Sequence, residues 1–179
     1  MPVEAFIKFT APTGANTPVP VGASGDVVFK DYARLTEFSF GIENQTTIGS
    51  ATGGAGAGRA QFREFTIRRT TDPSSNAIYR NCAAGAHYGL VTIVVRQVGS
   101  PGGKPHIVYN FGMVFTVRIE YAGPGDEGPE EVVTFAYGAL SIATAKQLPD
   151  GRLEPLKNTD WNQVTNTPTF TTQAALLTF

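Results

Sequence analysis

The chain has 179 residues, 41% of them hydrophobic, and a formal net charge of −1. This length and apolar content indicate a folded domain with a substantial core and exclude a disordered chain. The near-neutral charge argues against nucleic acid or an anionic membrane surface as a partner, because both require clustered basic residues. The single cysteine excludes an internal disulfide framework. No apolar run approaches the roughly 20 residues of a membrane helix, so we expect no membrane insertion.

The chain begins MPVEAFIKFT, which has neither the basic start nor the apolar run of a signal peptide. We therefore expect a protein that folds in the reducing cytoplasm. If it leaves the cell, it uses a route that reads no N-terminal signal.

Many short segments rich in Phe, Val, Ile and Thr, separated by 20 glycines and 12 prolines, predict an all-β fold with one short α-helix. The strands expected, in chain order, are Val3–Phe9, Val27–Tyr32, Leu35–Ile42, Ala60–Arg69, Leu90–Val98, residues 107–121 and Val132–Ile142.

Residues 51–60, ATGGAGAGRA, raise the question of a phosphate-binding loop. Gly53 and Gly58 have the spacing of such a loop, but Arg59 and Ala60 stand where lysine and a hydroxyl residue are needed. A strand follows, whereas a phosphate loop leads into a helix. The pattern favours a connection whose backbone is free of bulky side chains.

The next segment is basic and carries Arg59, Arg63, Arg68 and Arg69 between aromatic residues. Stacking on single-stranded nucleic acid is one interpretation. Pairing with acidic groups across a protein contact is favoured, because no net positive charge supports the first interpretation.

One helix is well marked. Asp72 is a suitable N-cap, Pro73 a suitable first residue, and Gly85 a suitable C-terminal stop. Its expected apolar stripe is Ile78, Tyr79 and Cys82.

The strand at Leu90–Val98 is apolar on both faces. Leu90 and Val94 face one side, and Val91, Ile93 and Val95 face the other. We expect a helix or a second subunit to cover its outer face.

The strand at 107–121 has apolar residues at every odd position, which predicts one continuous inward face. Gly112 lies on its opposite face, where the strand can bend or another backbone can approach. In the strand that follows, the apolar phase changes after Tyr137, which predicts a bulge near Gly138.

No catalytic, cofactor-binding or metal-binding residues are predicted, so we do not expect an enzyme. The two histidines, His87 and His106, have no partner at metal-ligand spacing, and Ser24 lacks the context of a nucleophile elbow. The acidic residues near 126–131 have no calcium-loop spacing and predict a solvated hairpin tip; they are Asp126, Glu127, Glu130 and Glu131.

Residues 146–179 have no sustained period and are interpreted as an extension of a domain at 1–145, not as a second domain. Trp161 is expected to hold this extension against the barrel or a partner, with Leu153, Leu156 and Phe179 as weaker anchors.

Over about residues 3–145 the chain resembles the haemolysin-coregulated proteins (Hcp) of type VI secretion. The segments that carry the resemblance are FIKF, LTEFSFGIEN, the glycine-rich loop, FREFTIRR, IYRNCAAGAH, VTIVVRQVG and DEGPEEVVTFAYGALSIA, in this order. The turn at Cys82–His87 before a β-rich run is the most telling part.

The resemblance implies an antiparallel β-barrel with one flanking helix that assembles as a homohexameric ring. Such rings stack into the inner tube of a contractile injector, some effectors travel inside them, and the proteins leave through the apparatus without a signal peptide. Family members carry no catalytic residues.

The resemblance also implies that Glu43–Arg59 reaches the adjoining ring. The ring-stacking residues expected there are Thr47, Ile48, Gly49, Ser50, Gly53, Gly54, Gly56, Gly58 and Arg59. The candidates for subunit contact are Arg63, Leu90, Val91, Ile93, Val95, Asp126 and Glu127. Two alternatives stay open: a tail-tube protein of a phage or another contractile injector, and a monomeric ligand-binding barrel.

Overall fold

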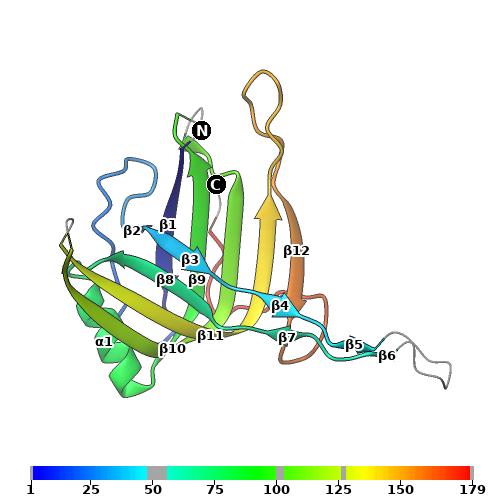
Figure 1. Cartoon of the computed structure of the whole chain (residues 1–179), viewed down its shortest axis with the longest axis horizontal. Helices are drawn as coiled ribbons and strands as arrows, with labels where there is room; N and C mark the ends of the chain where they lie inside the picture. Colours follow the sequence, from blue (N-terminus) through cyan, green and yellow to red (C-terminus); the bar gives the residue numbers. More distant parts are fainter. Residues whose placement is uncertain (1, 48–55, 100–102, 126–127, 178–179) are drawn as a thin grey trace.

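The computed structural model describes residues 2–47, 56–99, 103–125 and 128–177. One helix, α1 (Ser75–Ala84), lies between the eighth and ninth strands (Figure 1). The strands are β1 (Val3–Thr10), β2 (Ala33–Leu35), β3 (Glu37–Ser39), β4 (Ile42–Glu43), β5 (Thr46–Thr47), β6 (Gly56–Ala57), β7 (Gln61–Phe62), β8 (Phe65–Thr70), β9 (His87–Gln97), β10 (Ile107–Gly125), β11 (Gly128–Thr144) and β12 (Lys157–Asn162).

The main sheet is antiparallel and runs in the order β2-β1-β9-β10-β11-β8-β3, with β12 added to β11. Its two end strands are consecutive in sequence, separated by Thr36 alone. The backbone N–H and the hydroxyl of Thr36 donate to the carbonyl oxygen of Arg68 at 3.0 and 2.9 Å. The sheet is therefore nearly closed, which confirms the predicted barrel with one helix.

The inside of the barrel is filled by aromatic and branched side chains, because successive residues of each strand alternate between its two faces. The Phe65 ring stacks on Phe111 with centroids 4.1 Å apart and on Phe135 at 4.7 Å. Such offset pairs add stability beyond the area that they bury.

The predicted strand at Val27–Tyr32 is wrong. The Asp26 carboxylate accepts hydrogen bonds from the backbone N–H groups of Val28 and Phe29 at 2.9 and 3.0 Å, so the chain turns here. The predicted strands at Leu35–Ile42 and Ala60–Arg69 are also interrupted: the first is divided among β2, β3 and β4, and the second between β7 and β8.

The single inward face predicted for β10 is interrupted after Phe111 and resumes at Ile119, which packs against the core. Met113 has a left-handed φ of 52°, and from there the buried residues are Val114 and Thr116, while Phe115 and Val117 are exposed. A left-handed residue in a strand turns the following side chains to the other face.

The bulge predicted near Gly138 is wrong, because Gly112 pairs with Ala139 and Val114 with Tyr137, so the register of β10 and β11 does not change there. The register shifts lie between Thr116 and Arg118 and between Ala122 and Gly125 of β10. The core-facing residues of β11 nonetheless change phase between Tyr137 and Leu140, around Gly138.

The helix begins two residues later than expected, with Ser74 at the N-cap position. Asp72 instead accepts a hydrogen bond from the backbone N–H of Ser74 at 2.8 Å. Gly85 ends the helix in the left-handed conformation, with φ of 65°, as predicted.

The apolar stripe predicted for α1 is partly wrong, because Tyr79 is exposed. The buried residues of the helix are Ser75, Ile78 and Asn81. The Asn81 side-chain amide donates to the carbonyl of Pro18 and to the Tyr88 hydroxyl, which offsets the cost of burying it.

The outer face of β9 is covered by the chain's own segments. Phe6, Val94 and Val108 form a second core with Phe29 of the turn after Asp26, and Leu177 of the C-terminal tail packs against it. The sequence led us to expect a helix or a second subunit over this face. In the described chain the turn after Asp26 and the C-terminal tail cover it instead.

An arginine fastens the turn near residue 26 to the sheet. The Arg96 guanidinium pairs with Glu4 of β1 and with Asp26, and it lies 5.2 Å from the ring centroids of Phe6 and Phe29. The hydrogen bonds from Arg96 lower the pKa of the Asp26 carboxyl.

Residues after 145 continue the same sheet. β12 pairs with residues 139–144 of β11, and the chain then crosses β9 and β10. Gly112 and Gly89 allow this crossing: a Cβ atom at Gly112 would lie 2.5 Å from the Thr171 carbonyl oxygen. The approach of another backbone that the sequence predicts at Gly112 is confirmed.

Candidate assembly surfaces

A two-stranded projection extends from the barrel and is called the arm; its described residues are 41–47 and 56–63 (Figure 1). β4 pairs with β7 at its base and β5 with β6 farther out. The Gly58 N–H donates to the Gln45 carbonyl at 2.9 Å, and a Cβ atom at Gly58 would lie 2.7 Å from that oxygen. Glycine at position 58 therefore keeps the two strands close.

The described part of the arm contains four of the residues that the sequence proposes for ring stacking. Thr47 lies in β5, Gly56 in β6, and Gly58 and Arg59 follow on the returning strand. The others lie outside the described residues; they are Ile48, Gly49, Ser50, Gly53 and Gly54.

Polar contacts fasten the base of the arm to the barrel. The Arg59 guanidinium donates to the carbonyl oxygen of Gln163, and the Gln163 N–H donates to the Gly138 carbonyl at 3.0 Å. Arg63 pairs with Glu43 across the two strands of the arm. Both arginines thus have partners within the chain, and the direction of the arm is set at its base.

An apolar hollow of about 310 Å³ lies beside the arm. We call it the arm-base hollow, and its lining residues are Ile42, Ala60, Phe62, Leu140, Ile142, Thr159, Asp160 and Trp161. Trp161 of β12 stands opposite Leu140 of β11 in the register of the sheet. Its indole Nε1 is buried and has no hydrogen-bond partner among the described residues.

A buried tyrosine lies next to this hollow. The Tyr137 ring packs edge-on against Phe62 with centroids 6.4 Å apart, and burial raises the pKa of its hydroxyl to about 12. The wall behind the arm is therefore a continuation of the barrel core.

The β9 residues proposed for subunit contact lie in the interior of the chain. Leu90, Val91 and Ile93 have no exposed area and Val95 is 7% exposed, because the core packs on one face of β9 and the chain's own cover on the other. Their side chains present no surface to a second copy in this structure. Asp126 and Glu127 lie outside the described residues.

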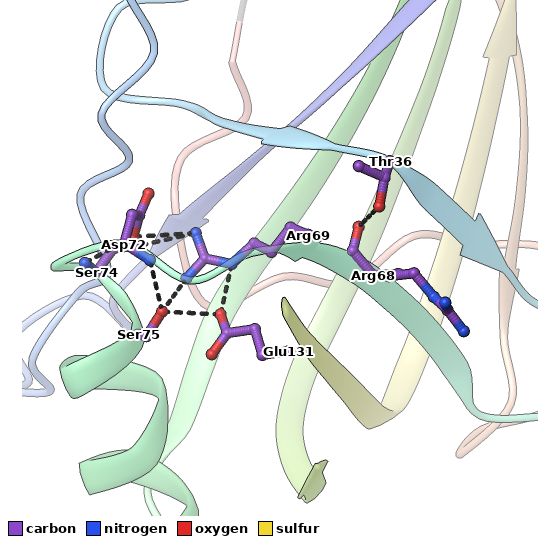
Figure 2. A network of polar contacts seen from close by, with 7 residues as sticks. All are labelled: Thr36, Arg68, Arg69, Asp72, Ser74, Ser75 and Glu131. Carbon is purple, nitrogen blue, oxygen red and sulfur yellow. Dashed lines mark hydrogen bonds and ion pairs between the residues drawn. The ribbon is translucent and has the colours of Figure 1, made fainter. Parts of the chain in front are cut away.

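The acidic and basic segments meet inside the molecule at Arg69 and Glu131 (Figure 2). The Arg69 Nε donates to Glu131 at 2.6 Å across β8 and β11, and the two side chains are 1% and 0% exposed. The guanidinium also donates to the hydroxyls of Ser74 and Ser75 at 2.8 and 3.0 Å, and Asp72 lies 3.3 Å away. Glu131 is thus part of a buried network and not of a solvated hairpin tip.

Other arginines of the basic segment also have partners within the chain. Arg68 pairs with Glu37 of β3 and Glu130 of β11 at 3.6 and 3.8 Å. Together with Arg63 and Arg69, three of the four arginines pair with carboxylates of their own chain, and the contact across two proteins expected from the sequence stays a prediction.

A second hollow, of about 590 Å³, lies near the start of α1 and is lined mainly by polar residues. One of its walls carries Glu4, which pairs with Arg34 at 3.3 Å, and another carries Asp72. The charged groups in its walls are therefore engaged in structural ion pairs.

The two histidines lie in different settings. The His87 ring stacks on Phe115 with centroids 5.1 Å apart, and its Nε2 lies 2.8 Å from the side-chain oxygen of Gln173. Burial lowers the pKa of His106.

Within the described residues no group of three or more His, Cys, Asp or Glu side chains could hold a metal ion. No helix in the described part of the chain is long and apolar enough to cross a membrane.

Several solved structures have a fold similar to that of this chain. A solved structure described as a type six secretion system protein is 20% identical, with a TM-score of 0.81 over 93% of this chain and 99% of its own. Hcp1 from Salmonella typhimurium is 16% identical, with a TM-score of 0.71 over 94% and 100% of the two chains. A type VI secretion system effector from Yersinia pestis is 16% identical, with a TM-score of 0.65 over 88% and 98%. At these identities the likeness shows the fold.

The comparison with curated proteins finds no match. The family model described as "Type VI secretion system effector, Hcp" matches residues 6–143. This range runs from β1 nearly to the end of β11 and includes the arm, α1 and the buried Arg69–Glu131 pair. The resemblance seen in the sequence is thereby confirmed, and the chain belongs to the Hcp family of type VI secretion proteins.

Proposed function

We propose that this Hcp-family protein is the repeating subunit of a type VI secretion tube, that it forms homohexameric rings, and that these rings stack and carry effectors. The observation that carries the proposal is the family match over residues 6–143. The family is structural, and the chain's role is assembly, not catalysis. It folds in the cytoplasm and leaves through the secretion apparatus.

A measurement of solution mass tests this function. At micromolar concentration, light scattering is expected to give six times the 19.0 kDa mass of the chain. A head-to-tail contact closes into a ring when its rotation fits an integral number of copies. A stable monomer would contradict the proposal and favour the ligand-binding barrel.

The arm is the proposed stacking element. Its outer part, β5 and β6, is a two-stranded ribbon, and such ribbons have little stability of their own in water. Arg59 and the Glu43–Arg63 pair fix its base, so the outer part is held away from the barrel as Figure 1 shows. Docking against the next ring offsets the entropy lost on ordering the arm, and glycine allows close backbone contact.

Shortening the chain between Gly49 and Gly58 is expected to leave single rings intact and to reduce the length and number of stacked tubes. Electron microscopy of concentrated protein measures both. A matched control shortens the turn at residues 149–151, which also projects from the sheet, and is expected to leave stacking unchanged. Tubes of parental length after shortening the arm would show that the glycines are a spacer.

A further inference from the structure

The arm is attached to the barrel without being part of its sheet. β4 pairs with β7 and β5 with β6, and among the described strands neither pair joins the main sheet. A strand inside a sheet is oriented by its ladder of backbone hydrogen bonds, and the arm has no such ladder to the barrel. The angle between the arm and the barrel therefore depends on side-chain contacts at the base of the arm.

The returning strand of the arm is held to the barrel at Phe62 and at Arg59. Phe62 packs against the core, with its ring edge-on to Tyr137, and the Arg59 guanidinium donates to the carbonyl oxygen of Gln163. A hollow of about 360 Å³ lies where the strand passes Gln163, and it is lined by Arg59, Ala60, Gln61, Phe62 and Gln163. Because side chains do not fill the space here, the hydrogen bond from Arg59 limits how far the arm can swing.

Gln163 is itself held by the sheet. Its backbone N–H donates to the Gly138 carbonyl at 3.0 Å, and its side-chain amide donates to the carbonyl oxygen of Tyr137. Tyr137 thus stands behind both attachments of the arm, because its ring meets Phe62 and its carbonyl holds Gln163. It lies within β11 and is 6% exposed, so the direction of the arm is referred to the packed core of the barrel.

The turn after β12 presents the Gln163 carbonyl in a fixed position. The side-chain oxygen of Asn162 accepts hydrogen bonds from the N–H groups of Val164 and Thr165 at 2.9 and 3.0 Å. The backbones of Asn162 and Thr167 exchange two further bonds, of 2.9 and 3.2 Å. An acceptor that is already ordered costs little additional entropy when it binds its donor. In Figure 1 this end of β12 lies beside the base of the arm.

We propose that β12 and the turn after it, residues 157–167, set the direction of the arm through the Arg59–Gln163 contact and thereby control ring stacking. Arg59 is a positioning residue, which acts within its own chain and not by touching the next ring. This assigns a role to the C-terminal extension, which lies beyond the family match at residues 6–143. An arm that points in many directions docks only from the fraction of copies in which it is correctly placed, and the apparent affinity for the next ring falls by that fraction. The consequence for stacking rests on the proposed function, whereas the orientation of the arm can be measured by itself.

The distance between two spin labels tests the orientation. The labels are placed at the exposed positions 45 and 157, as Gln45→Cys in the arm and Lys157→Cys in β12, with Cys82→Ser to remove the native thiol. Labelled protein is diluted into an excess of unlabelled protein, so that an assembly contains one labelled chain. The parent is expected to give one narrow distance distribution, and Arg59→Ala a wider one. Arg59→Lys is expected to restore the narrow distribution, since one ammonium donor can replace a single guanidinium bond.

Gln163→Ala tests the same contact from the barrel side. It leaves the sequence of the arm unchanged but removes the side-chain bond to the Tyr137 carbonyl, so it is also expected to widen the distribution. Arg152→Ala is the matched control, because it removes an exposed arginine of the extension that pairs with Asp150 within its own turn. It is expected to leave the distribution unchanged. A parental distribution in Arg59→Ala or in Gln163→Ala would overturn the inference.

Stacking is measured on the unlabelled variants by light scattering and electron microscopy. Arg59→Ala is expected to form rings of parental mass but to need at least about 10-fold more protein to form tubes, as for the loss of one hydrogen bond to a charged group. Gln163→Ala is expected to shift in the same direction.

The outcomes for the inference and for the proposed function differ. Parental tubes in Gln163→Ala but not in Arg59→Ala would mean that Arg59 contacts the next ring itself, and parental tubes in both would remove the link to stacking. Either result would overturn the inference and leave the proposed function standing. A parent protein that forms neither rings nor tubes would instead contradict the proposed function and the stacking part of this inference, while the label distances would still decide whether Arg59 orients the arm.

Discussion

Replacing Glu131 with alanine is expected to lower the free energy of unfolding by about 3–5 kcal/mol, because it removes the closer and fully buried one of the two carboxylates that pair with the buried Arg69 guanidinium. Arg69 is 1% exposed and cannot reach bulk water without rearrangement. The hydroxyls of Ser74 and Ser75 still accept its hydrogen bonds, and the partly exposed Asp72 carboxylate, 3.3 Å away, offsets its charge only in part. For a chain of this length the loss corresponds to a melting temperature lower by roughly 6–20 °C.

Urea denaturation followed by circular dichroism measures this change. Glu130→Ala is the matched control. It removes a carboxylate from the neighbouring position, and the pair that Glu130 forms with Arg68 is partly exposed and 3.8 Å apart. Its effect is expected to stay below about 1 kcal/mol. A double change to apolar residues, Arg69→Met/Glu131→Leu, is expected to recover most of the stability. A single Glu131→Ala variant as stable as Glu130→Ala would show that Arg69 is satisfied without Glu131.

The sequence contained a signal for this buried pair that charge counting overlooks. Arg69 has the same strand phase as the buried Phe65 and Ile67, and Glu131 has the same phase as Val133. Opposite charges at inward positions of two strands suggest a pair. Arg69 and Glu131 are 62 residues apart in the sequence. That they stand opposite each other depends on how β8 and β11 pair, and neither strand alone shows this register.

Local signals predicted the elements that depend on local chemistry. Gly85 ends α1 because only a residue that tolerates a left-handed φ fits there. The prediction failed where one residue changes the backbone direction: Asp26 forms a turn in a segment of strand-like composition, and after Met113 the two faces of β10 are exchanged over residues 114–117. Such effects depend on side-chain hydrogen bonds and on packing, which a period-two pattern does not contain.

The candidate surfaces were predictable in part. The glycine-rich segment indicated the arm, and the isolated Trp161 indicated an anchoring residue. The hollow itself joins Ile42 and Phe62 of the arm to Leu140 and Trp161 of the sheet, and this meeting of distant segments follows from the closure of the barrel. Tyr79 was wrongly assigned to the buried stripe of α1. Helical spacing predicts which residues share a face of the helix, but it does not show whether that face points to the core.

β9 is apolar on both faces, and its composition indicated that the outer face is covered but not which segment covers it. Its outer face is covered by Phe29 and by Leu177, which lies 80 or more residues from β9 in the sequence. Hydrogen bonds also fasten the crossing segment: the Thr172 hydroxyl donates to the Gly89 carbonyl at 2.9 Å, and the Thr13 N–H to the Gln173 carbonyl at 2.7 Å. The tail therefore contributes to the core, and its release has a cost that can be measured.

Replacing Gly112 with alanine is expected to displace the tail from β10 and to lower the free energy of unfolding by about 1–3 kcal/mol, the usual cost of overpacking. The added Cβ would lie 2.5 Å from the Thr171 carbonyl oxygen, a distance at which backbone must move. Gly112 lies in the sheet between β9 and β11, so the tail is the part that can yield. Limited proteolysis with chymotrypsin is expected to cut at Phe170 much faster than in the parent protein. Gly123→Ala on the same strand is the control, because a Cβ there meets no atom within 4 Å; equal cleavage rates in the two variants would show that the tail is held independently of Gly112.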